Sequence, residues 1–200
     1  MGIPFSWEIR EGSVSGANIL RGMGNVGQQL RGSQWGLGKA RAIAAEIGGD
    51  RAGVRALVRE LFGEDVEVRK RAADVARRVT ERDGRLLERY ADELAGLLET
   101  LPMEESRTRW HLGLVVPRVA HTRAQRLRAA RTMSLLAGDE SNVVRCSAVE
   151  GLGLLASHEA SLRDGAEEMI ERFLREGTKA MKCRARAVMR LWARSERKKK

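Results

Sequence analysis

Apolar residues recur every three or four positions in four stretches of the chain, which is the spacing of one face of an α-helix. The stretches begin at residues 68, 108, 144 and 181, so they follow one another at intervals of 40, 36 and 37 residues. In each stretch a basic residue stands second and a small or apolar residue stands fifth. The four sequences are VRKRAADVARRV, TRWHLGLVVPRV, VRCSAVEGLGLL and MKCRARAVMRLW. The pattern predicts four equivalent helices and therefore an internal repeat.

A second helix is predicted before each of these, over residues 52–62, 86–101, 124–137 and 162–175. Short polar turns join the members of each pair, and Asp65, Ser141 and Thr178 are suited to cap the second helix. A helical pair of this length cannot bury its apolar face alone, so neighbouring pairs are expected to stack. We therefore predict an all-α fold, an α-solenoid of about four helical hairpins over residues 50–195.

The composition supports this fold class. Ala, Leu, Arg and Glu dominate, aromatic residues make up 4% of the chain and only 3 prolines occur, which favours helices over strands. Residues 1–49 differ, because 9 of the 21 glycines lie before residue 39 and no long amphipathic period begins before residue 37. We predict an irregular, Gly-rich N-terminal arm with a short helix near its end. Residues 196–200 are predicted to form a basic tail.

Two of the helical pairs resemble a known repeat family. The strings LVRELFGEDVEVRKRAADVARRV and TMSLLAGDESNVVRCSAVEGLGLLA are similar to HEAT repeats, in the broad sense that includes the lyase-type HEAT-like repeats. Residues 105–194 also resemble a group of uncharacterised bacterial HEAT-repeat proteins. The resemblance is best at Asp65 and Asp139 with the Val-Arg that follows each, and it is weaker at Pro117 and Thr178. It implies an α-solenoid but no single function, since this fold carries scaffolds, nucleic-acid binders and a few enzymes.

The HEAT resemblance also implies a structural role for one set of charges. In that family the Arg of the Val-Arg pair commonly reaches the Asp of a neighbouring turn. The expected ladder consists of Arg69, Arg109 and Arg145 with Asp65 and Asp139.

The net charge of +10 is concentrated at one end of the chain. Residues 177–200 contain 10 Lys and Arg but one acidic residue. Basic residues recur there at intervals of four, opposite the apolar Met181, Ala185, Val188 and Trp192, which predicts an amphipathic helix with a cationic face. The basic positions are Lys182, Arg186, Arg190, Arg194 and, just beyond, Arg197. Such a face suits either a solvated end cap or an anionic partner.

Other candidate contacts with a partner lie outside this helix. Seven arginines between residues 107 and 131, among them Arg123 and Arg126, occur with no acidic residue between them, and we expect them to add electrostatic steering. Trp7 and Trp35, on the glycine-rich arm, are predicted to contact a second chain. Gly22, Gly24 and Gly27 have the spacing of a dinucleotide-binding loop, but no βαβ unit fits before residue 50, so a flexible loop is favoured.

Several chemistries are not expected. No nucleophile, base and orienting acid stand in a recognisable motif, and the three histidines are too far apart to form a local metal site. Cys146 and Cys183 are predicted to be packed thiols and suit a reducing compartment. No apolar run is long enough to span a membrane, and no signal peptide is evident. We therefore predict a cytoplasmic protein with no catalytic residues, cofactor, metal, membrane contact or small-molecule substrate.

These observations predict a non-enzymatic HEAT-repeat adaptor. Its macromolecular partner would be an acidic segment in a protein complex or, alternatively, a nucleic-acid backbone. A rival hypothesis is a HEAT-like alkylpurine DNA glycosylase, in which Trp110, Trp192, Arg109 and Arg145 would form part of a basic cradle. The acid of such a cradle is not matched, because Asp74 and Glu150 stand at a repeat position that is Leu114 and Ala187 elsewhere. The lyase-type repeats add a third hypothesis, a bilin-lyase-like function.

Overall fold

The computed structural model describes residues 26–197, and this part of the chain contains helices and no strand, which confirms the all-α prediction. Residues 26–31 are helical. The elements that follow are α2 (Leu37–Ile47), α3 (Arg51–Leu61), α4 (Val66–Arg82), the 3₁₀ helix η1 (Gly84–Tyr90), α5 (Ala91–Thr100), α6 (Ser106–Val119), α7 (Arg123–Leu136), α8 (Asn142–His158), the short 3₁₀ helix η2 (Ala160–Leu162), α9 (Arg163–Glu176) and α10 (Lys179–Arg197).

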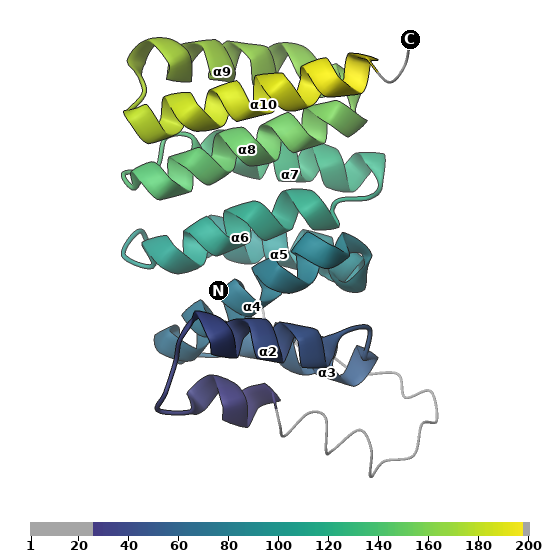
Figure 1. Ribbon diagram of the computed structural model, residues 1–200, viewed down its shortest axis with the longest axis vertical. Coiled ribbons are helices and arrows are strands. Elements are labelled where there is room, and N and C mark those ends of the chain that lie inside the picture. The colour runs from purple at the N-terminus through teal and green to yellow at the C-terminus, as the bar shows by residue number, and fades with distance from the viewer. Residues whose placement is uncertain (1–25, 198–200) are drawn as a thin grey trace, which may run out of the picture.

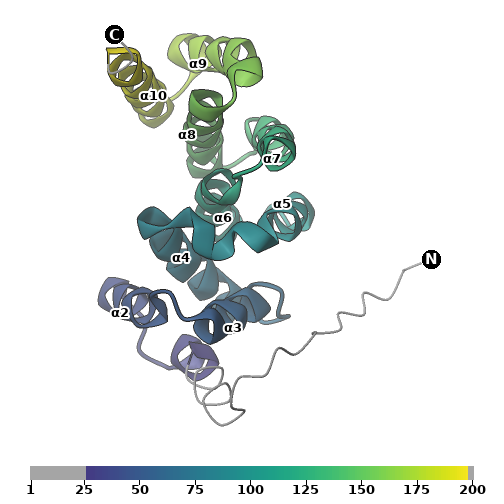
Figure 2. The same ribbon diagram turned by 90° about the vertical axis from the view of Figure 1, so that its right-hand side faces the viewer.

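The helices form two layers along the long axis of the molecule. The even-numbered helices α2, α4, α6, α8 and α10 follow one another in one layer, and each contacts the next (Figure 1). The helices α3, α5, α7 and α9 form the second layer (Figure 2). Each of these packs on the even-numbered helix that follows it in the chain. The long helices predicted from the apolar period thus lie in the first layer and their shorter partners in the second.

The sequence of α4 shows how such a helix is built. The Asp65 carboxylate accepts hydrogen bonds from the backbone N–H groups of Glu67 and Val68, which caps the first turn. The apolar face of the helix, at intervals of three and four residues, is buried against α2, α3 and α6. Its members are Val68, Ala72, Val75, Ala76 and Val79, all at most 3% exposed. The apolar spacing therefore decides which side of α4 faces the core.

Close helix packing requires glycine at two places. A Cβ atom at Gly153 in α8 would lie 2.2 Å from Val188 Cγ1 in α10, so glycine sets the distance between these two helices. A Cβ atom at Gly84 would lie 2.1 Å from the backbone oxygen of Arg118, so glycine lets η1 approach α6. Neither contact could be inferred from the local pattern, since each joins residues more than 30 positions apart.

Part of the segment that was expected to be irregular packs onto the helices. Val26 and Leu30 are buried, and the apolar core runs without a break from them through Ile43 and Ile47 into α3 and α4. The flexible loop predicted at Gly22, Gly24 and Gly27 is wrong at Gly27, which lies in the helical segment 26–31. The other two glycines and Trp7 lie outside the described residues, as do residues 198–200 of the predicted basic tail. Residues 196–197 of that predicted tail belong to the helix α10 instead. The short helix expected near residues 37–47 is α2.

Arg71 of α4 holds this N-terminal segment in place. Its guanidinium donates hydrogen bonds to the backbone oxygens of Leu30 and Gly32, at 2.8 and 2.9 Å, and lies 5.2 Å from the ring centre of Trp35. Trp35 is therefore engaged within the chain, although it was predicted to contact a second one. Within residues 26–197, no helix combines the length and the apolar character that a membrane crossing requires.

Candidate functional site

The outer face of α10 carries a row of basic side chains without acidic partners. Lys182 is half-buried, and Arg186, Arg190 and Arg194 are exposed. Within residues 26–197, the ion pairs of α10 are those of Arg184 with Glu150 and of Glu196 with Arg163. The row itself and the exposed Arg197 make none. Successive members of the row are about 6 Å apart along the helix axis, because each step is four residues.

The opposite face of α10 fixes the row in position. Met181, Ala185, Val188 and Trp192 are at most 4% exposed, at the places that the apolar spacing predicts. The Trp192 indole N–H donates a hydrogen bond to the backbone oxygen of Gly153 in α8, at 2.9 Å. The Arg163 guanidinium of α9 lies over the face of the ring, 3.6 Å from its centre. The helix is therefore packed against both α8 and α9, and its basic row points away from them.

Two ion pairs join successive repeats at the turns. Arg69 in α4 pairs with Glu105 of the next turn at 2.9 Å, and Arg109 in α6 pairs with Asp139 of the turn after it at 2.6 Å. Arg109 also donates to the backbone oxygen of Leu101, and both members of its ion pair are buried. A buried pair of this kind leaves an uncompensated charge if one member is removed.

The other members of the expected ladder are placed differently. Asp65 caps α4 and makes no ion pair in the described part of the chain. Arg145 lies over the Phe173 ring at 5.6 Å, and its Nε is buried without a hydrogen-bond partner. The turn that Arg145 would reach contains Thr178 where the earlier turns contain Glu105 and Asp139. The Ser141 side chain does not cap α8, and Asp139 instead accepts from the Ser141 backbone N–H.

The arginine run of residues 107–131 is largely paired with acidic residues from other repeats. Arg128 lies near Asp92 and Glu99, and Arg123 and Arg126 lie 3.7 and 3.9 Å from Glu159. Arg126 also donates to the backbone oxygen of His121 at 2.6 Å, whereas the Arg123 side chain is 71% exposed. Within residues 26–197, Arg107 and Arg131 are the exposed members of the run without an ion pair. Most of the expected positive surface here is therefore neutralised.

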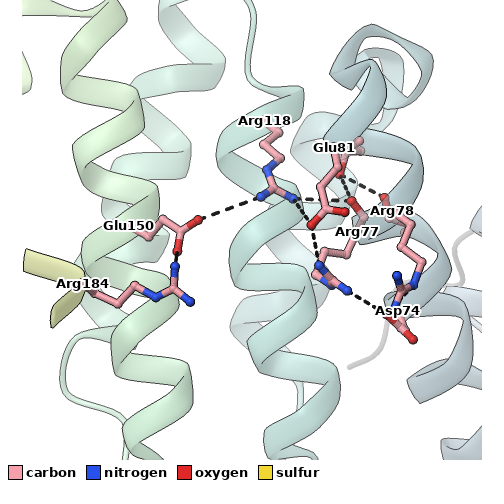
Figure 3. Close-up of polar contacts among 9 residues, drawn as sticks. Asp74, Arg77, Arg78, Glu81, Arg118, Glu150 and Arg184 are labelled. Carbon is pink, nitrogen blue, oxygen red and sulfur yellow. Dashed lines mark hydrogen bonds and ion pairs between the residues drawn. The ribbon is translucent and has the colours of Figure 1, made fainter. Parts of the chain in front are cut away.

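A chain of charges crosses the layer of even-numbered helices (Figure 3). Glu150 of α8 pairs with Arg184 of α10 at 2.8 Å and lies 3.9 Å from Arg118 of α6. Arg118 is also 3.9 Å from Glu81 of α4. Burial lowers the pKa of Arg118, and the two glutamates oppose that shift. Four helices are thus connected by alternating charges across their common face.

On α4 this chain ends in a cluster around one buried carboxylate. Asp74 accepts from Arg77 at 3.2 Å and pairs with Arg78 at 3.1 Å, while Arg77 also pairs with Glu81. Asp74 is 8% exposed and its charge is matched by these arginines. The cluster contains two acidic and two basic residues, so its charges cancel. We therefore interpret it as structural rather than as a basic binding surface.

The residues considered for a glycosylase cradle are not gathered on the surface. Trp192 is buried with its indole N–H bonded, and Arg109 is buried in the pair with Asp139. Trp110 is half-buried and stacks on His111, with ring centres 4.4 Å apart. Cys146 is buried, which raises the pKa of its thiol, and Cys183 is exposed. Among the described residues no group of His, Cys, Asp and Glu is arranged to hold a metal ion.

The sequence reasoning missed the acidic partners of the arginine run and of α10. Glu81, Glu150 and Glu159 lie on other helices or turns than the arginines of the run near them. Counting charges along the sequence therefore does not show that these groups are close in space. The sequence contains one indication of these contacts, which is the repeat interval. Arg184 lies 34 positions after Glu150 and Glu150 lies 32 after Arg118, both close to the length of one repeat. No protein-family model matches the chain, and no similar sequence is found among curated proteins.

Proposed function

We propose that the chain is an α-solenoid of HEAT-like hairpins that serves as a non-enzymatic cytoplasmic adaptor, and that it binds an anionic macromolecule along the outer face of α10. The row of Lys182, Arg186, Arg190 and Arg194 carries the proposal. Within residues 26–197, the row combines four basic residues on one face of a single helix, and none of them has an acidic partner. The two-layered stack supports the solenoid, because each hairpin buries its apolar face against its neighbours.

The geometry of the row favours a regular polyanion. Its members lie on one helix whose other side is fixed by Trp192, so the charges are held at regular intervals along the helix. A nucleic-acid backbone presents closely and evenly spaced phosphates to such a row and requires no sequence-specific contact. An acidic protein segment offers fewer charges in a less regular arrangement. We therefore place nucleic acid first and an acidic protein segment second as the partner.

Binding of a fluorescent DNA duplex, measured by anisotropy over a range of salt concentrations, tests this function. The logarithm of affinity should fall linearly with the logarithm of salt, by about 0.9 for each phosphate neutralised. In Arg186→Glu/Arg190→Glu the affinity should fall and the slope should shrink by about 2. The exposed residues of α9 provide a matched control, Arg172→Glu/Arg175→Glu, with the same change of charge.

The comparison of the two double variants decides the outcome. An equal loss of DNA affinity in the α10 and α9 variants would mean that net charge alone drives the interaction. The proposed role of α10 would then be wrong. Tight binding of a polyglutamate peptide by the wild type, lost only in the α10 variant and accompanied by no DNA binding, would identify an acidic protein segment as the partner. No binding to either probe would contradict the proposal.

A further inference from the structure

A groove at one edge of the stack is lined by four arginines from two elements. It has a volume of about 770 Å³ and lies between the start of α3 and the 3₁₀ helix η1. Arg51 and Arg55 line it from α3, and Arg85 and Arg89 line it from η1. Arg51, Arg85 and Arg89 are exposed and Arg55 is half-buried. This volume is within the range of small-ligand sites, about 300 to 1,000 Å³.

A contact between η1 and α7 borders the groove. The Gln125 side chain, near the start of α7, donates a hydrogen bond to the backbone oxygen of Glu88 at 3.3 Å. Gln125 is itself held by the capping box of α7, in which its side chain accepts from the Thr122 backbone N–H. Tyr90 adds a half-buried ring, which Arg89 covers at 5.3 Å from its centre. The walls are therefore fixed by secondary structure rather than by a free loop.

The four guanidinium groups of the groove have no acidic partners within residues 26–197. By contrast, Arg69, Arg71, Arg77 and Arg78 on the adjacent α4 each pair with a carboxylate. Glu88 is the one acidic residue of the lining, and it makes no ion pair in the described part of the chain. The groove thus gathers more positive charge than its own residues neutralise.

Two local features make this arrangement unfavourable without a bound anion. Arg51 is the first residue of α3, where the helix dipole disfavours a cation, and the first turn of α3 contains no acidic residue. Arg55 lies one helical turn further along the same face, so two like charges are neighbours. The Asp50 side chain is engaged with the backbone N–H groups of Ala52 and Gly53, which it caps. An anion with several charges would relieve both.

We propose that this groove binds a compact polyphosphate ligand, such as a nucleoside triphosphate or inorganic tripolyphosphate, through Arg51, Arg55, Arg85 and Arg89. The planar guanidinium group presents paired N–H donors that match two phosphate oxygens, and four such groups suit a chain of two or three phosphates. The sequence alone predicted no small-molecule ligand, because the two arginine pairs lie 34 residues apart and the groove arises only when α3 and η1 pack together. This site is separate from α10 and does not rest on the proposed function.

Titration calorimetry of the full chain with inorganic tripolyphosphate tests the site. We expect saturable binding by the wild type and a loss of affinity of about tenfold or more in Arg55→Ala/Arg89→Ala. Arg51→Ala/Arg85→Ala, which changes exposed residues only, should show the same loss. The matched control is Arg41→Ala/Arg82→Ala, which removes two exposed arginines outside the groove that have no ion pair within residues 26–197. Its affinity should stay within about twofold of the wild type.

Each of the following results would overturn the proposal. The wild type could show no saturable binding of tripolyphosphate. The control variant could lose as much affinity as the groove variants. Finally, Arg186→Glu/Arg190→Glu could lose affinity while the groove variants lose none. Helical circular dichroism identifies a variant that fails to fold, in which case the other groove variant decides. Parallel titrations with a nucleoside triphosphate and with a DNA duplex distinguish the source of the phosphates. Binding of the duplex without binding of tripolyphosphate or the nucleoside triphosphate would also contradict the proposal of a compact ligand.

Discussion

His111 is a buried residue whose charged form is disfavoured by the fold. It is 7% exposed, and burial lowers its pKa to about 4, an effect to which Arg77 and Arg78 add and which Asp74 opposes. In the unfolded chain the pKa is near 6.5. Between these two values the unfolded state binds a proton that the folded state does not. The contribution of His111 to stability is therefore complete above about pH 6.5 and is lost as the pH falls toward 4.

This difference predicts a pH-dependent stability. Lowering the pH from 7 to 5 should reduce the free energy of unfolding by about 2 kcal/mol through His111. Urea denaturation at a series of pH values measures the effect. In His111→Gln the dependence between pH 7 and pH 5 should be much flatter, whereas His158→Gln, at an exposed position, should retain it. A slope that is the same in both variants would show that other groups cause the pH dependence.

Trp192 is a buried aromatic side chain of α10 that also makes a hydrogen bond. Trp192→Ala should lower the free energy of unfolding by about 3 to 5 kcal/mol, because the truncation would leave a cavity between α8, α9 and α10. It would also leave the Gly153 carbonyl without its hydrogen-bond donor. Trp192→Phe should cost less, since it retains the ring. Denaturant midpoints measure both changes. A value near zero for the alanine variant would place Trp192 at the surface of the folded protein.

The turn before α10 lacks the acidic residue that completes the two earlier turns. Arg69 and Arg109 reach Glu105 and Asp139, whereas Arg145 makes no ion pair within residues 26–197 and the turn before α10 contains Thr178. Thr178→Asp should therefore stabilise the chain by about 1 kcal/mol, through an ion pair with Arg145 and a stronger cap on α10. The same substitution in an Arg145→Met background measures the cap alone. Equal gains in the two backgrounds would exclude the ion pair.

At the scale of the helices, the sequence predicted the features that depend on the spacing of nearby residues. The faces of α4 and α10 follow from apolar positions three and four residues apart, and the turns follow from residues such as Asp65. Contacts between repeats were harder to predict because they depend on register. The Arg69 partner is Glu105, which is not one of the two aspartates of the expected ladder, and the acidic neighbours of Arg118 come from α4 and α8. The arginine groove has no local sequence signal, since α3 and η1 must pack before it exists.

At the scale of the whole molecule, residues 26–197 form a stack in which the interior even-numbered helices contact a neighbour on each side of their layer, and this connectivity predicts uneven stability. Interior helices such as α6 and α8 are supported on both sides, whereas α10 is supported on one. Opening of a part of the structure is expected to begin at such ends. Amide hydrogen exchange, followed by mass spectrometry, should therefore be slower in α6 and α8 than in α10.

A substitution between α8 and α10 tests whether the stack opens in parts. Gly153→Ala places a Cβ atom 2.2 Å from Val188 Cγ1, so α10 must move away from α8. If stability is a sum over neighbouring contacts, exchange should become faster in α9 and α10 and stay unchanged in α2 and α3, at the far end of the stack. Faster exchange by the same factor in every helix would instead mean that residues 26–197 unfold as one cooperative unit, because the altered contact would then be felt equally along the whole stack.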